Sequence, residues 1–197
     1  MELADIVADL ASAFKAEDDK RLQPKPKYQQ GLGPYDERVA VAAALQFLAV
    51  SKPASYGMVR LDVPYPHNTK RKCDIVLPDL WAIEVKLLRP FNDNGSEAEG
   101  QWVQNVLHPY PTSPGANSAI ADYVRLQESD FPERKAIIIY GFEHSLPVMP
   151  LSITISAFEL IARQIVGLNL GQRYEARFTE LVHPVHQQGA VFGWEVK

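Results

Sequence analysis

The chain is short of cysteine, of histidine and of long apolar runs, and each shortage narrows what it can be. It has 1 Cys and 5 His in 197 residues, and neither His108 nor His144 lies at a zinc-ligand spacing from another His or Cys. A lone cysteine cannot form an internal disulfide, which favours a reducing compartment. No apolar stretch approaches roughly 18 residues, and the first residues lack a basic-then-apolar signal pattern. We therefore expect a cytoplasmic protein without a membrane association.

Positive charge is also scarce. The sequence has 20 Lys and Arg against 24 Asp and Glu, for a net charge of -4. Because most affinity for nucleic acid comes from neutralising phosphates, this balance argues against a tight, autonomous DNA binder. The charge is uneven along the chain, however, and Lys70, Arg71 and Lys72 form one basic segment. We therefore expect binding of nucleic acid to depend on such local basic segments or on a partner subunit.

The order of predicted elements indicates one α/β domain over residues 1–197. An amphipathic helix covers 1–17, a Pro- and Gly-containing loop covers 18–34, and the core covers 35–197. Further helices are predicted over 35–50, 101–107, 116–127 and 156–168, and strands over 56–65, 135–140, 174–182 and 190–196. The run 135–140 is almost purely aliphatic, which is typical of an interior strand. The helix over 116–127 then serves as the crossover that leads to it.

The most informative segment runs from Asp74 to Lys86. Two apolar runs, 75–77 and 80–83, are joined by Pro78 and Asp79, which predicts a tight hairpin whose first strand opens at Asp74. Glu84 and Lys86 are two residues apart on the second strand and so share a face. Two acids and a lysine would thus meet where the hairpin spreads open. Such a group is costly to bury unless the charges neutralise one another or hold a cation, and carboxylates suit Mg²⁺.

Asp74 followed by Glu84-Val85-Lys86 resembles the signature of the PD-(D/E)xK nuclease superfamily, although Cys73 stands where the name of the family has proline. The resemblance implies a restriction-endonuclease-like fold, a mixed central sheet flanked by helices. It also implies that Asp74, Glu84 and the Val85 carbonyl hold Mg²⁺, with Mn²⁺ as a substitute. Lys86 would then orient or activate the attacking water. A solvated surface pair of Glu84 and Lys86 is the alternative.

Glu37 and Arg125 are secondary candidates. Glu37 lies in the first turn of the helix over 35–50, after the candidate cap Asp36, and the resemblance implies an extra metal or water ligand there. Equally, it could complement the helix dipole. Arg125 shares a helix face with Asp122, so it could bind phosphate or pair with that acid.

These features predict a Mg²⁺-dependent endonuclease or phosphodiesterase that acts on DNA, with RNA left open as a substrate. Lys70, Arg71, Lys72 and Arg125 would contact the nucleic acid. The alternative is a nuclease-fold recognition or scaffold subunit of a larger nucleic-acid-processing or defence assembly, without catalysis of its own. A homodimer is expected, because double-strand cutters need two active sites. The run from Val191 to Trp194 could form the dimer edge or simply complete the sheet.

Overall fold

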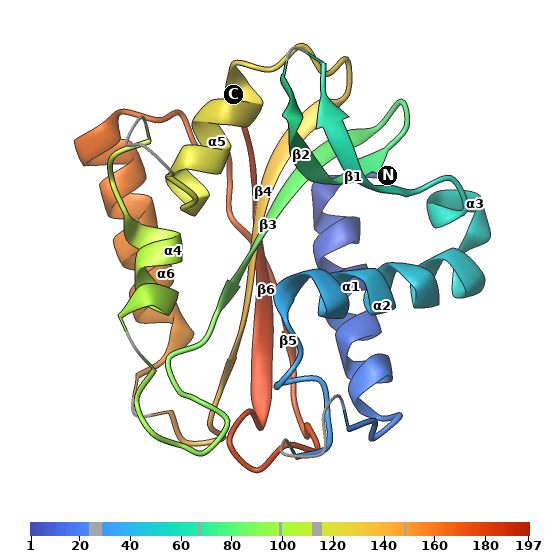
Figure 1. Cartoon of the computed structure of the whole chain (residues 1–197), viewed down its shortest axis with the longest axis vertical. Helices are drawn as coiled ribbons and strands as arrows, with labels where there is room; N and C mark the ends of the chain where they lie inside the picture. The colour runs from blue at the N-terminus through green and yellow to red at the C-terminus, as the bar shows by residue number, and fades with distance from the viewer. Residues whose placement is uncertain (24–28, 67, 99, 112–115, 148) are drawn as a thin grey trace.

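The structure is a computed structural model that describes residues 1–23, 29–66, 68–98, 100–111, 116–147 and 149–197. A six-stranded mixed sheet lies between two groups of helices (Figure 1), so the predicted α/β class with a flanked mixed sheet is confirmed. The strand order is β1-β2-β3-β4-β6-β5. The strands are β1 Arg60–Tyr65, β2 Asn68–Leu77, β3 Trp81–Leu88, β4 Arg134–Glu143, β5 Tyr174–Phe178 and β6 Gln188–Glu195.

The first three strands form an antiparallel meander, and β4 then runs parallel to β3. A parallel neighbour needs a crossover, which α4 (Gln101–Leu107) and α5 (Ala119–Gln127) supply across one face of the sheet. The predicted interior strand is confirmed, because β4 pairs with β3 on one side and β6 on the other, and its aliphatic residues are buried.

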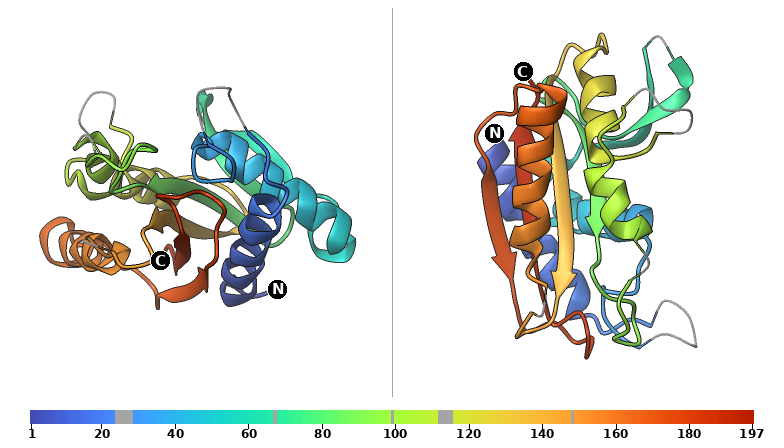
Figure 2. Two further views of the ribbon diagram at one scale, coloured as in Figure 1. Left: turned by 90° about the horizontal axis from the view of Figure 1, so that it is seen from below. Right: turned by 90° about the vertical axis from the view of Figure 1, so that its left-hand side faces the viewer.

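The two faces of the sheet carry different helices, which Figure 2 shows most clearly from below. α1 (Leu3–Asp18) and α2 (Glu37–Ser51), followed by the short α3 (Pro53–Tyr56), cover one face. α4, α5 and α6 (Leu151–Leu160), with the π-helical turn η1 (Ile161–Val166), cover the other. The helical spacing of apolar residues explains α1, whose buried stripe includes Leu3, Ile6, Val7, Leu10 and Phe14. None of the helices in the described ranges is both long and apolar enough to cross a bilayer.

Several predicted boundaries were wrong. β2 begins at Asn68, so Asp74 lies inside the strand, because β1 pairs with the polar residues that precede the apolar run. The crossover helix begins at Ala119, where the Ser118 hydroxyl accepts a hydrogen bond from the Ala121 N–H. α6 begins at Leu151, directly after Pro150, instead of at residue 156. Residues 24–28 of the predicted loop fall outside the described residues.

The proposed dimer edge was also wrong. The residues from Val191 to Trp194 belong to β6, which pairs with β4 on one side and β5 on the other. Val191, Phe192 and Trp194 are buried in the two cores that flank the sheet. They therefore complete the sheet, which was the second of the two interpretations.

Candidate functional site

The site lies where β2 and β3 separate. Their pairing ends at Ile75 and Ile83, and the next residues along the two strands are Asp74 and Glu84. There the Val85 N–H donates a hydrogen bond of 2.8 Å to the Asp74 carboxylate. Beyond the last paired residues of β2 and β3, the carboxylate of Asp74 thus replaces the backbone carbonyl that would accept this hydrogen bond in a continuing sheet. As predicted, Asp74 and Glu84 therefore lie opposite each other where the two strands of the hairpin separate.

Glu84 and Lys86 point from β3 toward α5 and are buried, with exposed fractions of 3% and 7%. This rules out the alternative of a solvated surface pair. The Tyr65 hydroxyl donates a 2.5 Å hydrogen bond to Glu84 Oε1. The Lys86 ammonium donates to the Val85 carbonyl, at 3.2 Å between Nζ and O, and lies 2.6 Å from Asp122 Oδ2. Both residues of the motif are therefore held by named partners.

α5 closes the network from the helix side. Asp122 forms an ion pair with Arg125 one turn further on, and Arg125 Nη1 lies 3.9 Å from Glu84 Oε1. Of the two alternatives for Arg125, the structure shows the pairing with Asp122, and phosphate binding stays a prediction. Its guanidinium also donates to the Ala116 carbonyl, so binding a phosphate would require it to exchange existing partners. Arg125 therefore lies between Asp122, which pairs with Lys86, and Glu84.

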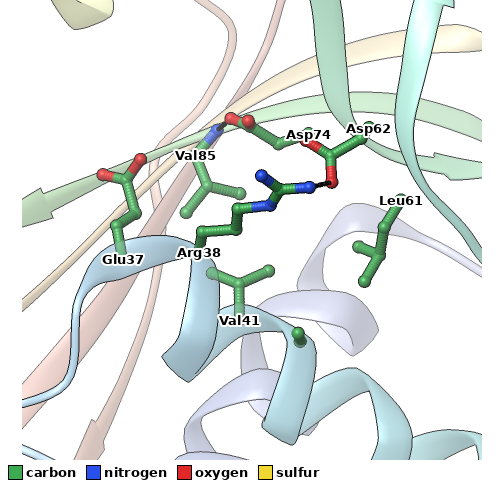
Figure 3. A pocket seen from close by; sticks show the side chains of 8 residues that line it. Glu37, Arg38, Val41, Leu61, Asp62, Asp74 and Val85 are labelled. Atoms are coloured by element: carbon green, nitrogen blue, oxygen red, sulfur yellow. Dashed lines mark hydrogen bonds and ion pairs between the residues drawn. The ribbon is translucent and has the colours of Figure 1, made fainter.

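Glu37 enters the site from the other helix layer. It lies in the first turn of α2, and its carboxylate accepts a hydrogen bond from the Leu87 N–H of β3. It lines the same pocket as Asp74 (Figure 3), and so its carboxylate is on the Asp74 side of the sheet. Arg89, just after β3, donates at 2.6 Å to the Tyr35 carbonyl. That contact fixes the start of α2 against the end of the motif strand.

The burial of so many acids shifts their pKa values. Burial, then the charges of Asp74 and Asp122, raise the pKa of Glu84 to about 10. Burial and the Asp74 charge raise the pKa of Glu37 to about 7, against the opposing effect of Lys86. Burial is the largest cause of both shifts, and the acids Glu37, Asp74, Glu84 and Asp122, which outnumber the cations Lys86 and Arg125, add to it.

Lys86 and Cys73 are shifted in ways that limit their chemistry. Burial disfavours the ammonium of Lys86, but the charges of Asp122, Glu37 and Asp74 outweigh it and raise the pKa. Lys86 is therefore a permanent cation near neutral pH and not a proton acceptor. Burial, together with Glu84 and Asp74, raises the pKa of the Cys73 thiol well above its usual range. The buried Cys73 thiol is therefore a core group and not a nucleophile.

The donor atoms suit a hard cation, although they are few. Among the described residues, no three His, Cys, Asp or Glu side chains are grouped so as to hold a metal ion. Two carboxylates, Asp74 and Glu84, and the Val85 carbonyl are the oxygen donors present. Mg²⁺ commonly takes one or two carboxylates and completes its shell with water, so this set fits that ion better than zinc.

The basic segment (Lys70, Arg71 and Lys72) is exposed on β2, just before Cys73 and Asp74. It lies on the part of β2 that pairs with β1 but not with β3. Its side chains are accordingly accessible from solution near the site.

Sequence reasoning missed two partners. Tyr65 ends β1, and only the register of β1 against β2 brings its hydroxyl to Glu84. Asp122 was considered only as a partner for Arg125, whereas it also pairs with Lys86. An acid on the crossover helix is the one signal that could have suggested that contact.

Comparisons of the chain with protein-family models, curated proteins and solved structures find no match. Its function must therefore be argued from the site itself.

Proposed function

We propose that the chain is a Mg²⁺-dependent phosphodiesterase that acts on DNA, with the restriction-endonuclease-like fold that its motif suggests. The observation that carries the proposal is that Asp74 meets the buried Glu84 and Lys86 at the point where β2 and β3 separate. The element order around it supports the same conclusion, since α2, the β1–β3 meander, the crossover and the parallel β4 follow in the sequence expected of that fold.

The residues would divide the work as follows. Asp74, Glu84 and the Val85 carbonyl would hold the cation, with Glu37 facing the same cavity as Asp74. A bound divalent ion supplies Lewis-acid activation of water and neutralises charge that develops on the phosphate oxygens. Lys86, kept protonated by Asp122, would donate a hydrogen bond to the attacking water or to a phosphate oxygen. Its raised pKa makes it an orienting cation and not a general base.

A cleavage assay tests the proposal. The purified protein should nick or degrade supercoiled plasmid with Mg²⁺ or Mn²⁺, and Lys86→Ala should abolish the cleavage. Lys52→Ala, a lysine paired at the surface with Asp9, is the matched control and should keep the activity. Cleavage that survives both EDTA and Glu84→Ala would reject the assignment.

One observation favours a second candidate, a nuclease-fold scaffold or recognition subunit without catalysis. Every charged group of the motif already has a protein partner, because Lys86 contacts Asp122 and Val85 while Tyr65 donates to Glu84. Such a network could simply stabilise the fold. Calorimetry separates the two candidates. Binding of Mn²⁺ that is lost in Glu84→Gln supports the enzyme, whereas no heat at millimolar ion supports the scaffold.

A homodimer is also proposed, since two active sites are needed to cut both strands. Its interface must lie elsewhere than β6. Light scattering that gives 22.1 kDa at working concentration would reject it.

A further inference from the structure

Asp74 and Glu37 also line a pocket of about 250 Å³, whose apolar part the cation site does not use. Part of its lining is apolar and comes from Val41 and Ala42 of α2, Leu61 of β1 and Val85 of β3. The charged residues Glu37, Arg38, Asp62 and Asp74 line the rest of it. A molecule bound there would rest on hydrocarbon and reach the metal-binding carboxylates with one end.

Arg38 and Asp62 supply an exchangeable charge at this pocket. Arg38 Nη2 lies 2.5 Å from Asp62 Oδ2, and Figure 3 shows the guanidinium extending toward Asp62 and Asp74. The Arg38 side chain is 76% exposed, so the ion pair contributes little to stability. Arg38 can therefore leave Asp62 for a phosphate, which its planar fork binds well.

The backbone at Asp62 is strained. Its φ of 52° lies in the left-handed region, which favours glycine and is unusual inside a strand. Its neighbours Leu61 and Val63 pair with Ile75 and Cys73, so Asp62 stands opposite Asp74. Strain of this kind gathers at ligand sites. Here the backbone conformation of Asp62 holds its carboxylate, the partner of Arg38, close to Asp74.

We propose that this pocket binds one nucleoside of the nucleic acid, adjacent to the scissile phosphate, while Arg38 contacts that phosphate. A nucleobase has apolar faces that suit Val41, Leu61 and Val85. The volume lies below the roughly 300–1,000 Å³ of pockets for drug-sized ligands, which limits the occupant to a single nucleoside. The inference rests on the proposed function and names the part of the substrate that this side of the site receives.

Methyl NMR with deoxyadenosine 5′-monophosphate and Mg²⁺ tests it. The methyl resonances of Val41, Leu61 and Val85 should shift on titration, while those of Ile155 and Leu151, on the opposite face, should not. Ala42→Phe fills the pocket from a half-buried position and should abolish the shifts. Ala43→Phe is the matched control, because the adjacent half-buried alanine does not line the pocket.

A second variant keeps the test decisive if Ala42→Phe unfolds. Arg38→Gln should weaken binding of the nucleotide by about tenfold, the loss of one charge-assisted hydrogen bond, yet leave binding of deoxyadenosine unchanged. Arg173→Gln should affect neither. Shifts that are absent, that occur elsewhere, or that Arg38→Gln reduces equally for nucleoside and nucleotide would overturn the inference.

The outcome is separable from that of the proposed function. Plasmid cleavage without nucleotide shifts rejects the pocket alone. Nucleotide shifts without plasmid cleavage reject the nuclease and leave a nucleotide-binding pocket.

Discussion

Lys86 and Asp122 form an ion pair inside the protein, with 2.6 Å between Nζ and Oδ2 and side-chain exposures of 9% and 1%. The pair links the motif strand to the crossover helix. It fixes the position of the ammonium and stabilises its charge. The ion pair decides what Lys86 can do, because a buried lysine without such a partner would tend to lose its proton.

Breaking that pair from one side should be costly. Asp122→Asn leaves Lys86 buried with less compensation and should lower the free energy of unfolding by about 3 kcal/mol. In the double variant Lys86→Met with Asp122→Asn the loss should be clearly smaller than the sum of the two single losses. Urea denaturation of the four proteins measures this. Additive losses would mean that the two residues do not interact.

Glu37→Gln should change stability in a pH-dependent way. The pKa of Glu37 is raised to about 7 in the folded protein, so the stability that its protonated form provides is present below about 4.5 and is lost as the pH rises through 7. Glutamine keeps an acceptor for the Leu87 N–H but carries no charge. The variant should therefore match the wild type at pH 4.5 and be more stable by about 3 kcal/mol at pH 8, since each pKa unit corresponds to about 1.4 kcal/mol.

The control for Glu37 is Glu128→Gln, which changes an exposed glutamate at the end of α5. Its free energy of unfolding should stay close to that of the wild type, because the side chain is exposed. If Glu37 only complements the dipole of α2, Glu37→Gln should instead destabilise by about 0.3–1 kcal/mol and leave Mn²⁺ binding intact.

Binding of a divalent ion should release protons. At pH 7 Glu84, whose pKa is about 10, is protonated and Glu37, whose pKa is about 7, is half protonated. Because ligand carboxylates must be ionised, binding of Mn²⁺ at pH 7 should release roughly one proton from Glu84, with roughly half a proton more where Glu37 also binds the ion, and should become tighter as the pH rises. Calorimetry in buffers with different ionisation enthalpies counts them. Binding without proton release would mean that these carboxyl groups are not at the ion.

The basic segment should control affinity for DNA and not the chemistry. Replacing Lys70, Arg71 and Lys72 with glutamate should weaken binding of duplexes of any sequence. The slope of the salt dependence should fall by roughly 1 for each phosphate that the protein no longer neutralises. Binding is measured by anisotropy in Ca²⁺. The same charge change at Lys52, Arg163 and Arg173 is the control, and equal weakening in both variants would reject a specific role for the segment.

The parts of the site that local spacing determines could be predicted from the sequence. Side-chain alternation along a strand puts Glu84 and Lys86 on one face, and the turn at Pro78 and Asp79 fixes the register that brings Asp74 opposite Glu84. Asp79 has φ 62°, a conformation that aspartate in a turn tolerates. These relationships depend on neighbours only a few residues apart.

The parts that depend on distant pairing could not be predicted. Tyr65 reaches Glu84 across two strands, and Asp122 reaches Lys86 from a helix 36 positions later in the chain. β6 is an interior strand only because β5 pairs with it on the side away from β4. The residues of β6 themselves do not reveal whether another strand pairs there. The apolar residues of an interior strand have the same sequence pattern as those of an edge strand that pairs with another chain.

Val85 takes part in the site through three separate groups. Its N–H binds Asp74, its carbonyl accepts from Lys86, and its side chain lines the neighbouring pocket. The first two interactions use only the main chain, which every residue except proline provides. A substitution of residue 85 can therefore change the shape of the pocket while the hydrogen bonds to Asp74 and Lys86 are kept. Selection for a new substrate could begin at this position without first losing the site.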